Sequence, residues 1–358
     1  MTNNLSLTFI LTPLLLAVWF SASALNAHAD WEHIPGTEVI GRVRLLESDG
    51  PRLYAVGDTG FYLSFDDGYT WRRREIGRGL EEFYITAIGS GDGAVYVGTT
   101  FHGVFRSDDG GNTWKHINEG LQVFDSPKWG PRHGIVEQLL VTGSGTVINV
   151  GYHYGTHISD NRGETWHSVL DEWIYPGNPD WRFGDSIWSM TEFDSYLWAV
   201  YSSTSGTVLR SADKGQTWES LPVVVPGNEH GFGQISDWAA IEDKLYVAGY
   251  LGFGRWNEAE RMWENLSRGF PDVPYMNQLA VNRRRIFATF YGLDRGVWLF
   301  DHPSETWVPV GPPDVDVHPL VSHQSDLYAG AENGIYRASI PIVSLYGKTA
   351  VTWGVIKQ

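Results

Sequence analysis

Short runs of alternating apolar and polar residues recur along the chain, separated by glycine or Asp-Gly pairs. Across residues 84–117, for example, the segments "YITAIGS", "AVYVGT", "GVFRS" and "TWKHI" follow one another. This period of two is typical of short β-strands, and no segment shows a sustained helical period. Seven equivalent second strands are marked by "LYAVGD", "VYVGTT", "VINVGY", "LWAVYS", "LYVAGY", "IFATFY" and "LYAGAE". We therefore expect a four-stranded unit that occurs seven times.

A second pattern, S-x-[DN]-x-G-x-T-W, repeats in register with these strands. It fits residues 64–71, 107–114, 159–166 and 211–218, and degraded copies end at Trp263 and Trp307. Together with Trp31, the tryptophans of this series are about 46 residues apart on average. Such a period indicates an array of supersecondary units. Four strands repeated seven times predict an all-β fold, a seven-bladed β-propeller of four-stranded antiparallel blades.

The repeated pattern suits the turn between the third and fourth strands of each unit, which we call the box turn. Its Ser and Asp or Asn side chains can accept hydrogen bonds from the turn's own N–H groups, and its Gly allows a positive φ. The Trp is expected to anchor the fourth strand against the neighbouring sheet. The predicted structural residues are Ser64, Asp66, Gly68, Trp71, Ser107, Asp109, Gly111, Trp114, Ser159, Asn161, Gly163, Trp166, Ser211, Asp213, Gly215 and Trp218.

These boxes resemble the Asp-box, or bacterial neuraminidase repeat, of sialidases, xyloglucanases, the sortilin domain and photosystem II assembly-factor propellers. The resemblance covers residues 31–341. It implies the propeller fold and leaves the chemistry open, because those families share the box and not the activity. The chain departs from two of them. Ile34-Pro35-Gly36 lacks the arginine of the sialidase Arg-Ile-Pro signature, and there is one propeller where a xyloglucanase has two.

The last unit lacks a fourth strand, whereas residues 31–34 have the fourth-strand pattern without a sheet of their own. We expect the N-terminal strand to complete the last blade, which removes two open edges. The alternative is closure by residues 351–353. The chain is accordingly divided into a signal peptide (residues 1–29), the propeller (30–341) and a C-terminal tail (342–358).

The N-terminal segment predicts export to the periplasm or the extracellular space. Residues 5–20 are an uncharged apolar run, and Ala27-His28-Ala29 matches a cleavage site. The segment departs from the usual pattern because residues 1–29 contain no Lys or Arg. The alternative is an uncleaved anchor helix, although the run is short for a span and Pro13 interrupts it.

Composition narrows the function classes. The net charge is −16 and there is no cysteine. General nucleic-acid binding is disfavoured by that charge, and disulfides, thiolate metal sites and acylated-cysteine anchors are excluded. No cofactor or metal is expected. The box aspartates recur at regular intervals, which indicates a structural role in turns and not calcium binding. His153 and His157 are four residues apart, and on strands that spacing does not by itself indicate a pair of metal ligands.

The candidate binding surface is the face that carries the fourth-to-first and second-to-third connections, opposite the box turns. Its three longest loops are residues 118–134, 171–186 and 223–236. Aromatic rings beside polar groups suit sugar or peptide ligands. The alternative is that these rings only pack the loops against the scaffold. The candidates are Trp129, Arg132, His133, His153, Tyr154, Tyr175, Trp181, Arg182, His230, Tyr250 and Tyr291.

Three functions remain open at this point. The first is an exported, non-catalytic binding protein that resembles the assembly-factor type and recognises a protein or glycan partner; the basic patch of that family is not evident. The second is a glycoside hydrolase, which needs two facing carboxylates; Asp185, Glu229 and Asp237 are the candidates, with Glu137 and Glu192 nearby. The third is a structural scaffold without a specific ligand.

Overall fold

The computed structural model describes residues 29–77, 85–126, 130–145, 147–151, 155–169, 187–201, 207–221, 235–250, 252–267, 275–291, 296–313 and 315–340. Within these ranges the chain forms seven four-stranded antiparallel sheets, which we number as blades 1 to 7, and one two-stranded hairpin. One 3-10 helix, η1 (Thr37–Ile40), lies between β1 and β2.

The first six sheets follow one another along the chain. Blade 1 contains β2 (Val43–Asp49), β3 (Arg52–Gly57), β4 (Gly60–Ser64) and β5 (Arg72–Arg74), and blade 2 contains β6 (Ile85–Gly91), β7 (Ala94–Thr99), β8 (Val104–Ser107) and β9 (Lys115–His116). Blade 3 contains β12 (Gln138–Val141), β13 (Val147–Gly151), β14 (Gly155–Ser159) and β15 (His167–Val169), and blade 4 contains β16 (Ile187–Phe193), β17 (Tyr196–Tyr201), β18 (Thr207–Ser211) and β19 (Glu219–Leu221). Blade 5 contains β20 (Ile235–Ile241), β21 (Lys244–Gly249), β22 (Gly252–Asn257) and β23 (Met262–Asn265), and blade 6 contains β24 (Tyr275–Asn282), β25 (Arg285–Tyr291), β26 (Val297–Asp301) and β27 (Thr306–Gly311).

Blade 7 combines the two ends of the described chain. Its strands β28 (Val317–His323), β29 (Asp326–Ala331) and β30 (Gly334–Ser339) are followed by β1 (Trp31–His33) as the outermost strand. Trp31 pairs with Ala338, and its indole Nε1 donates to the carbonyl of Val310 at 3.1 Å. Closure by the N-terminal strand is therefore confirmed, and residues 351–353 of the alternative lie outside the described residues.

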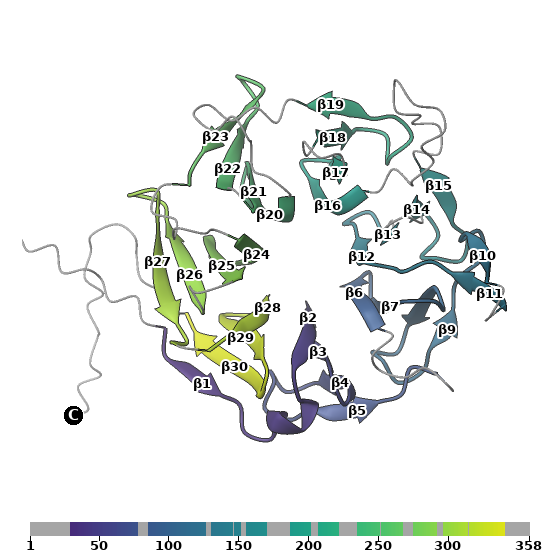
Figure 1. The fold of residues 1–358 in the computed structure, drawn as a ribbon, viewed down its shortest axis with the longest axis horizontal. Helices are drawn as coiled ribbons and strands as arrows, with labels where there is room; N and C mark the ends of the chain where they lie inside the picture. Colours follow the sequence, from purple (N-terminus) through teal and green to yellow (C-terminus); the bar gives the residue numbers. More distant parts are fainter. Residues whose placement is uncertain are drawn as a thin grey trace, which may run out of the picture.

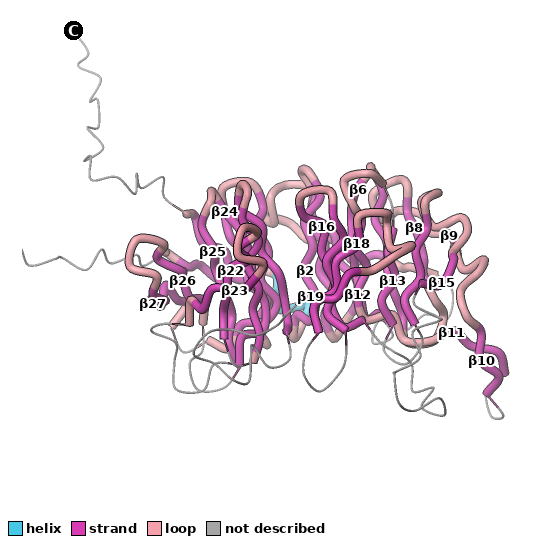
Figure 2. Tube along the Cα trace, turned by 90° about the horizontal axis from the view of Figure 1, so that it is seen from above, coloured by secondary structure: helices cyan, strands magenta, loops and turns pink. Residues whose placement is uncertain are grey.

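The sheets are arranged as a ring. Each first strand (β2, β6, β12, β16, β20, β24 and β28) contacts the first strands of both neighbouring blades, including β2 against β28. Figure 1 shows the sheets radiating from a central axis, and Figure 2 shows the disc from its rim. The expected all-β propeller of four-stranded antiparallel blades, closed by the N-terminal strand, is confirmed.

The core lies between adjacent blades. Tyr54 and Phe61 of blade 1, for example, pack with Val95, Val97 and Phe105 of blade 2. Because both faces of each second strand meet a neighbouring sheet, these strands are apolar along nearly their whole length. Burial of these side chains supplies most of the stabilisation, at about 25 cal/mol per Å² of apolar surface.

The box turns have the hydrogen bonds that their residues predict. In blade 2, Ser107 Oγ donates to Asp109 Oδ1 at 2.8 Å and accepts from the N–H of Gly111 at 2.7 Å. Asp109 accepts from the N–H and the hydroxyl of Thr113 at 2.8 and 2.7 Å. Gly111 has a φ of 91°, and Trp114 Nε1 donates to its carbonyl at 3.2 Å. The turns of blades 1 and 4 repeat this network.

The turn of blade 3 differs in two ways. Asn161 replaces the aspartate, so its Nδ2 donates to the hydroxyl of Thr165 at 2.8 Å where a carboxylate would accept. The ring of Trp166 is buried, and its Nε1 donates to the carbonyl of Ile117 in blade 2. This tryptophan therefore holds blade 3 against the residues that lead into the long loop after β9.

Residues 1–28, most of the expected signal peptide, and residues 341–358 lie outside the described residues. In the part of the chain that is described, no helix is long and apolar enough to cross a membrane.

Candidate functional site

The connection between β9 and β12 contains a hairpin where the sequence predicted a loop. Its strands are β10 (Val123–Ser126) and β11 (Gly130–His133), paired from Val123 opposite His133 to Ser126 opposite Gly130. Figures 1 and 2 show it at the rim beside blades 2 and 3, projecting beyond the disc. Val123 is 54% exposed. The hairpin thus extends the loop-rich face outward at this seam.

The hairpin is fixed to the second-to-third turn of blade 2. The N–H of His133 donates to the carbonyl of Phe101 at 3.1 Å, and the guanidinium of Arg132 lies 5.1 Å from the centre of the Phe101 ring. A guanidinium at this distance is attracted by the negative face of the ring. His133 Nδ1 also lies 3.2 Å from the carbonyl oxygen of Gln122. Arg132 and His133 are two of the predicted ligand-binding residues. They are neighbours on a surface that these contacts with the Phe101 turn fix in place.

The turn that receives the hairpin is itself anchored. Asn118 Nδ2 donates to the carbonyl of His102 at 2.8 Å, and its Oδ1 accepts from the N–H of Val104 at 2.8 Å. The N–H of His102 donates to the hydroxyl of Thr99 at 2.9 Å. Asn118 thus connects the end of blade 2 to its own second-to-third turn, which sets the position of Phe101 and His102 beneath the hairpin.

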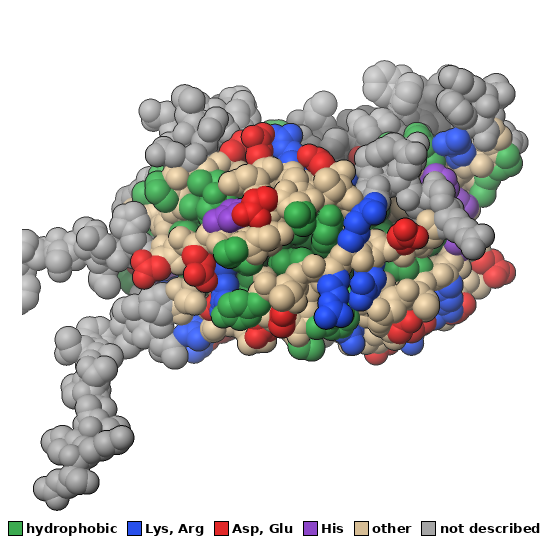
Figure 3. All heavy atoms as spheres, turned by 90° about the horizontal axis from the view of Figure 1, so that it is seen from below, with side chains coloured by type: hydrophobic (Ala, Val, Ile, Leu, Met, Phe, Trp, Pro, Cys, Tyr) green, Lys and Arg blue, Asp and Glu red, His purple; other side chains and the backbone are tan. Residues whose placement is uncertain are grey.

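Histidines collect around this junction. Burial, and then the positive charges of Arg132, His116 and His133, lower the pKa of His102. Desolvation beside the Phe105 ring, whose centre is 4.1 Å from that of His116, and then the charge of His133 lower the pKa of His116. Figure 3 shows histidine and Lys or Arg side chains together at the end of the disc where β10 and β11 lie. No sequence motif indicated that His102 and His116 belong to one cluster.

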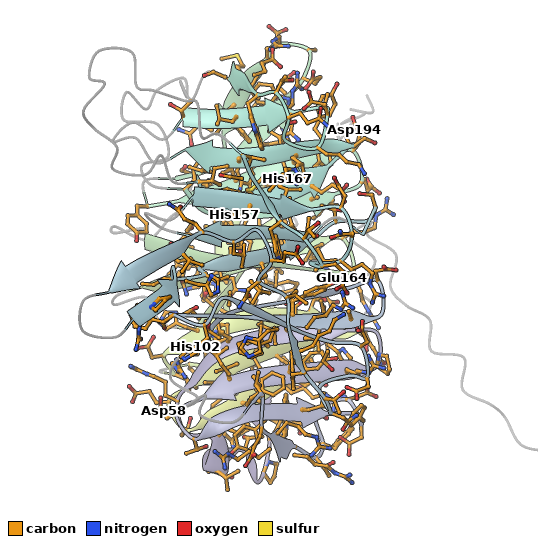
Figure 4. The ribbon with its side chains drawn as sticks, turned by 90° about the vertical axis from the view of Figure 1, so that its right-hand side faces the viewer. Asp58, His102, His157, Glu164, His167 and Asp194 are labelled. Atoms are coloured by element: carbon orange, nitrogen blue, oxygen red, sulfur yellow. The ribbon has the colours of Figure 1, made fainter. Side chains whose placement is uncertain are left out.

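A small, water-sized pocket opens next to this cluster, between blades 2 and 3. Figure 4 labels His102 and His157 toward the side where the hairpin projects, and Glu164 toward the opposite side. The predicted residues His153 and Tyr154 lie outside the described residues. The pocket is lined by Gly103, Leu121, Gln122, His133, Gly134, Ile135, Val136, Gly151, Gly155 and His157.

Among the other predicted ligand residues, Tyr250 has a described side chain. Tyr250 follows β21 in blade 5, on another part of the ring from the hairpin (Figure 1). Tyr291 ends β25 in blade 6, and its side chain is not among those described. Outside the described residues lie Trp129, Tyr175, Trp181, Arg182 and His230, together with the catalytic candidates Asp185 and Glu229.

Asp237, the third catalytic candidate, joins two blades. It follows a bulge in β20, and its Oδ2 accepts from the N–H of Leu279 in blade 6 at 2.8 Å, while Oδ1 accepts from the N–H of Trp238 at 2.8 Å. Burial raises the pKa of Asp237 to about 6. Gln278 and Gln138 make the same kind of contact to the next first strand along the ring. Both carboxylate oxygens of Asp237 are thus engaged by backbone N–H groups.

One Ser–His–Asp arrangement lies at the opposite face, where blades 7 and 1 meet. His323 Nδ1 is 2.8 Å from Ser48 Oγ, and its Nε2 is 3.0 Å from Asp67 Oδ1. The His323 side chain is 1% exposed, so a substrate cannot reach it. A catalytic histidine must contact the reacting groups. This arrangement therefore serves as a link across the closing seam of the ring. Among the described residues, no group of three His, Asp or Glu side chains could hold a metal ion.

No protein-family model matches the sequence, and no curated protein matches it either. Solved structures do resemble it. YCF48 from Cyanidioschyzon merolae has a TM-score of 0.59 at 15% identity, with 86% of this chain and 98% of that chain covered. A structure of YCF48 bound to D1 peptide has a TM-score of 0.61 at 14% identity, with 90% of this chain and 97% of that chain covered.

Two further resemblances come from larger proteins. The extracellular domain of BT4673 from B. thetaiotaomicron has a TM-score of 0.59 at 12% identity, with 87% of this chain and 40% of that chain covered. The GH74 enzyme of Niastella koreensis has a TM-score of 0.61 at 15% identity, with 86% and 53% covered. At these identities the likeness shows the β-propeller fold alone, which is shared by a protein bound to a peptide, an extracellular domain and an enzyme.

Proposed function

We propose that this chain is an exported, non-catalytic, seven-bladed binding propeller that recognises a partner protein through its loop-rich face. The observation that carries the proposal is the β10–β11 hairpin, held by Arg132 and His133 against the Phe101 turn beside the pocket. An isolated two-stranded hairpin has little stability of its own in water. A hairpin anchored at its base and extended beyond the disc therefore suits contact with another molecule.

A protein partner fits the hairpin better than a glycan does. Outside the hairpin itself, neither β10 nor β11 is paired with another described strand, so their backbone groups can accept an added extended segment. The likeness to YCF48 bound to D1 peptide supports this choice by fold, because a propeller of this type accommodates a peptide. The photosystem partner itself is not carried over.

The experiment compares two variants of the full chain as bait for proteins from the envelope of the native cell. Arg132→Gln changes the hairpin junction, whereas Arg72→Gln removes an equal charge from the exposed strand β5 of blade 1. We expect capture of a partner by the native chain and by Arg72→Gln, and reduced capture by Arg132→Gln. Equal capture by all three would refute binding at this junction.

The hydrolase and glycan alternatives are tested on the same preparations. A glycan array separates a lectin-like protein from a protein-binding one, and a panel of chromogenic glycosides detects turnover. Turnover that is lost in Asp185→Asn or Glu229→Gln would refute the non-catalytic reading. N-terminal sequencing of the exported chain tests the signal peptide, since cleavage after Ala29 is expected.

A further inference from the structure

The junction of the hairpin with blade 2 gathers groups that are positive or become positive when protonated. Arg132 lies over the Phe101 ring, and His133 is held to the carbonyl of Phe101. His102 directly follows Phe101, and its carbonyl accepts from Asn118, two residues after His116, at 2.8 Å. The charges of Arg132, His116 and His133 disfavour protonation of His102, and the charge of His133 disfavours protonation of His116. In a chain of net charge −16, this is a local concentration of cationic groups.

Taking the proposed function as its basis, we propose that the partner presents a carboxylate to the cluster of Arg132, His102, His116 and His133, and that binding tightens as the pH falls. A single carboxylate on an extended segment fits better than a polyanion, because the overall negative charge of the chain repels a long run of negative charges. An arginine fork next to imidazoles suits a carboxylate through charge-assisted hydrogen bonds.

The sign of the pH dependence follows from linkage. In the free protein, burial and the mutual repulsion of positive groups hold the pKa values of His102 and His116 below 6.5. A bound carboxylate offsets that repulsion and raises both values, so binding takes up protons. Affinity must then rise as pH falls, by roughly tenfold for each histidine whose pKa moves by one unit.

Other titratable and charged groups lie on the elements around the cluster. His157, on β14 of blade 3, is 5% exposed and lines the pocket. Burial raises the pKa of Glu137. The neighbouring charged residues are Lys115, which pairs with Glu164, then Glu119 in the turn after β9 and Glu137 before β12.

The test is an NMR titration of the full chain that follows the imidazole Cε1–H signals, assigned with the single variants His102→Gln, His116→Gln and His133→Gln. Three N-acetylated tripeptides serve as probes. N-acetyl-Val-Glu-Val-amide carries a side-chain carboxylate, N-acetyl-Val-Gln-Val carries only its C-terminal carboxylate, and N-acetyl-Val-Gln-Val-amide carries none. The first two arms distinguish the source of the carboxylate, and the third is the neutral control.

We expect at least one carboxylate probe to raise the pKa values of His102 and His116, with a dissociation constant roughly tenfold lower at pH 5.5 than at pH 7.5. Arg132→Gln should abolish the response, whereas His167→Gln, at an exposed position on β15, should keep it. Equal responses to the neutral and charged probes, no response to any probe, or pH-independent affinity would overturn the carboxylate proposal. Capture of a partner that depends on Arg132 would still support the proposed function in that case, so the two failures are distinguishable.

Discussion

The box turn of blade 2 allows a sharp test of how these turns stabilise the propeller. Asp109 accepts four hydrogen bonds, from Ser107 Oγ at 2.8 Å, from the N–H of Asn112 at 3.1 Å, and from the N–H and hydroxyl of Thr113 at 2.8 and 2.7 Å. Asp109→Ala removes all four. Each is worth about 1 kcal/mol net, and water replaces part of that loss because the turn is exposed. We expect unfolding free energy to fall by about 2 kcal/mol.

Asp109→Asn is the matched control, because blade 3 already contains that turn. Asn161 Oδ1 accepts from the N–H of Thr165 at 3.0 Å, and its Nδ2 donates to the hydroxyl of the same residue. The asparagine turn thus keeps a hydrogen bond to both the N–H and the hydroxyl of its threonine. At pH 7 we therefore expect Asp109→Asn to cost less than about 0.5 kcal/mol, well below the alanine variant.

Native protein and Asp109→Asn should respond differently to acid. The hydroxyl and then the N–H of Thr113 lower the pKa of Asp109 to about 2. Since this value is below that of the unfolded chain, the carboxylate contributes stability at pH above 3.8, and the contribution is lost as pH falls toward 2. Because an amide does not titrate, native protein should lose stability relative to Asp109→Asn as the pH falls from 4 to 2, and the asparagine variant should be the more stable of the two at pH 2.

The assay is urea unfolding followed by tryptophan fluorescence, at pH 7, 4 and 2. An alanine variant with the native midpoint would show that the side-chain network does not stabilise the turn. An asparagine variant as unstable as the alanine variant would refute the explanation by hydrogen-bond pairing.

Three further predictions follow from the packing and from the raised pKa values. Trp114→Ala should lower stability by about 3 kcal/mol, because its ring packs edge-on against Phe61 of the neighbouring blade at 5.6 Å between centres; an unchanged melting temperature would contradict this. Glu47→Gln should stabilise the protein at pH 8 by about 1–2 kcal/mol and leave its stability unchanged at pH 4.5. Burial raises the pKa of Glu47 to about 7, so the stability that the protonated carboxyl contributes is lost as the pH rises through that value. A gain in stability at both pH values would refute this prediction. Asp237→Asn should lower the free energy of unfolding by about 2 kcal/mol, measured by thermal unfolding. The reason is that an amide cannot accept from both backbone N–H groups that the carboxylate engages. Unchanged stability would show that this contact between blades 5 and 6 is dispensable.

The fold was predictable because each level of the sequence agrees with the next. The residues of the box predict the turn between the third and fourth strands, because they form the hydrogen bonds of that turn. The strand pattern at Trp31, which has no sheet of its own in the sequence, predicts the closure that β1 makes with β30. The repeat pattern does not predict how one box turn differs from another. Trp166 keeps its place in the motif, yet its ring turns to Ile117 of the preceding blade because the residues after β9 pack on it.

The sequence predicted which face of the propeller carries the candidate site, but not where on that face the site lies. The long loop after β9 was recognised by its length, but its hairpin depends on contacts with the Phe101 turn, which is 32 residues earlier than His133 in the sequence. His102 and His116 carried no motif, because they come together only when blade 2 folds. Asp237 looked like a possible acid because carboxylates near a loop-rich face are common, whereas its partners are backbone N–H groups of the next blade that no side-chain pattern reveals.

The central claim is that binding takes place on the loop-rich face at the hairpin. The most direct measurement is hydrogen–deuterium exchange of the full chain with and without its captured partner. We expect protection of residues 99–103 and 130–136 on binding, with no change in the box turns at residues 64–71 and 107–114. Protection confined to the box turns would contradict the account, since it would place the partner on the opposite face of the disc.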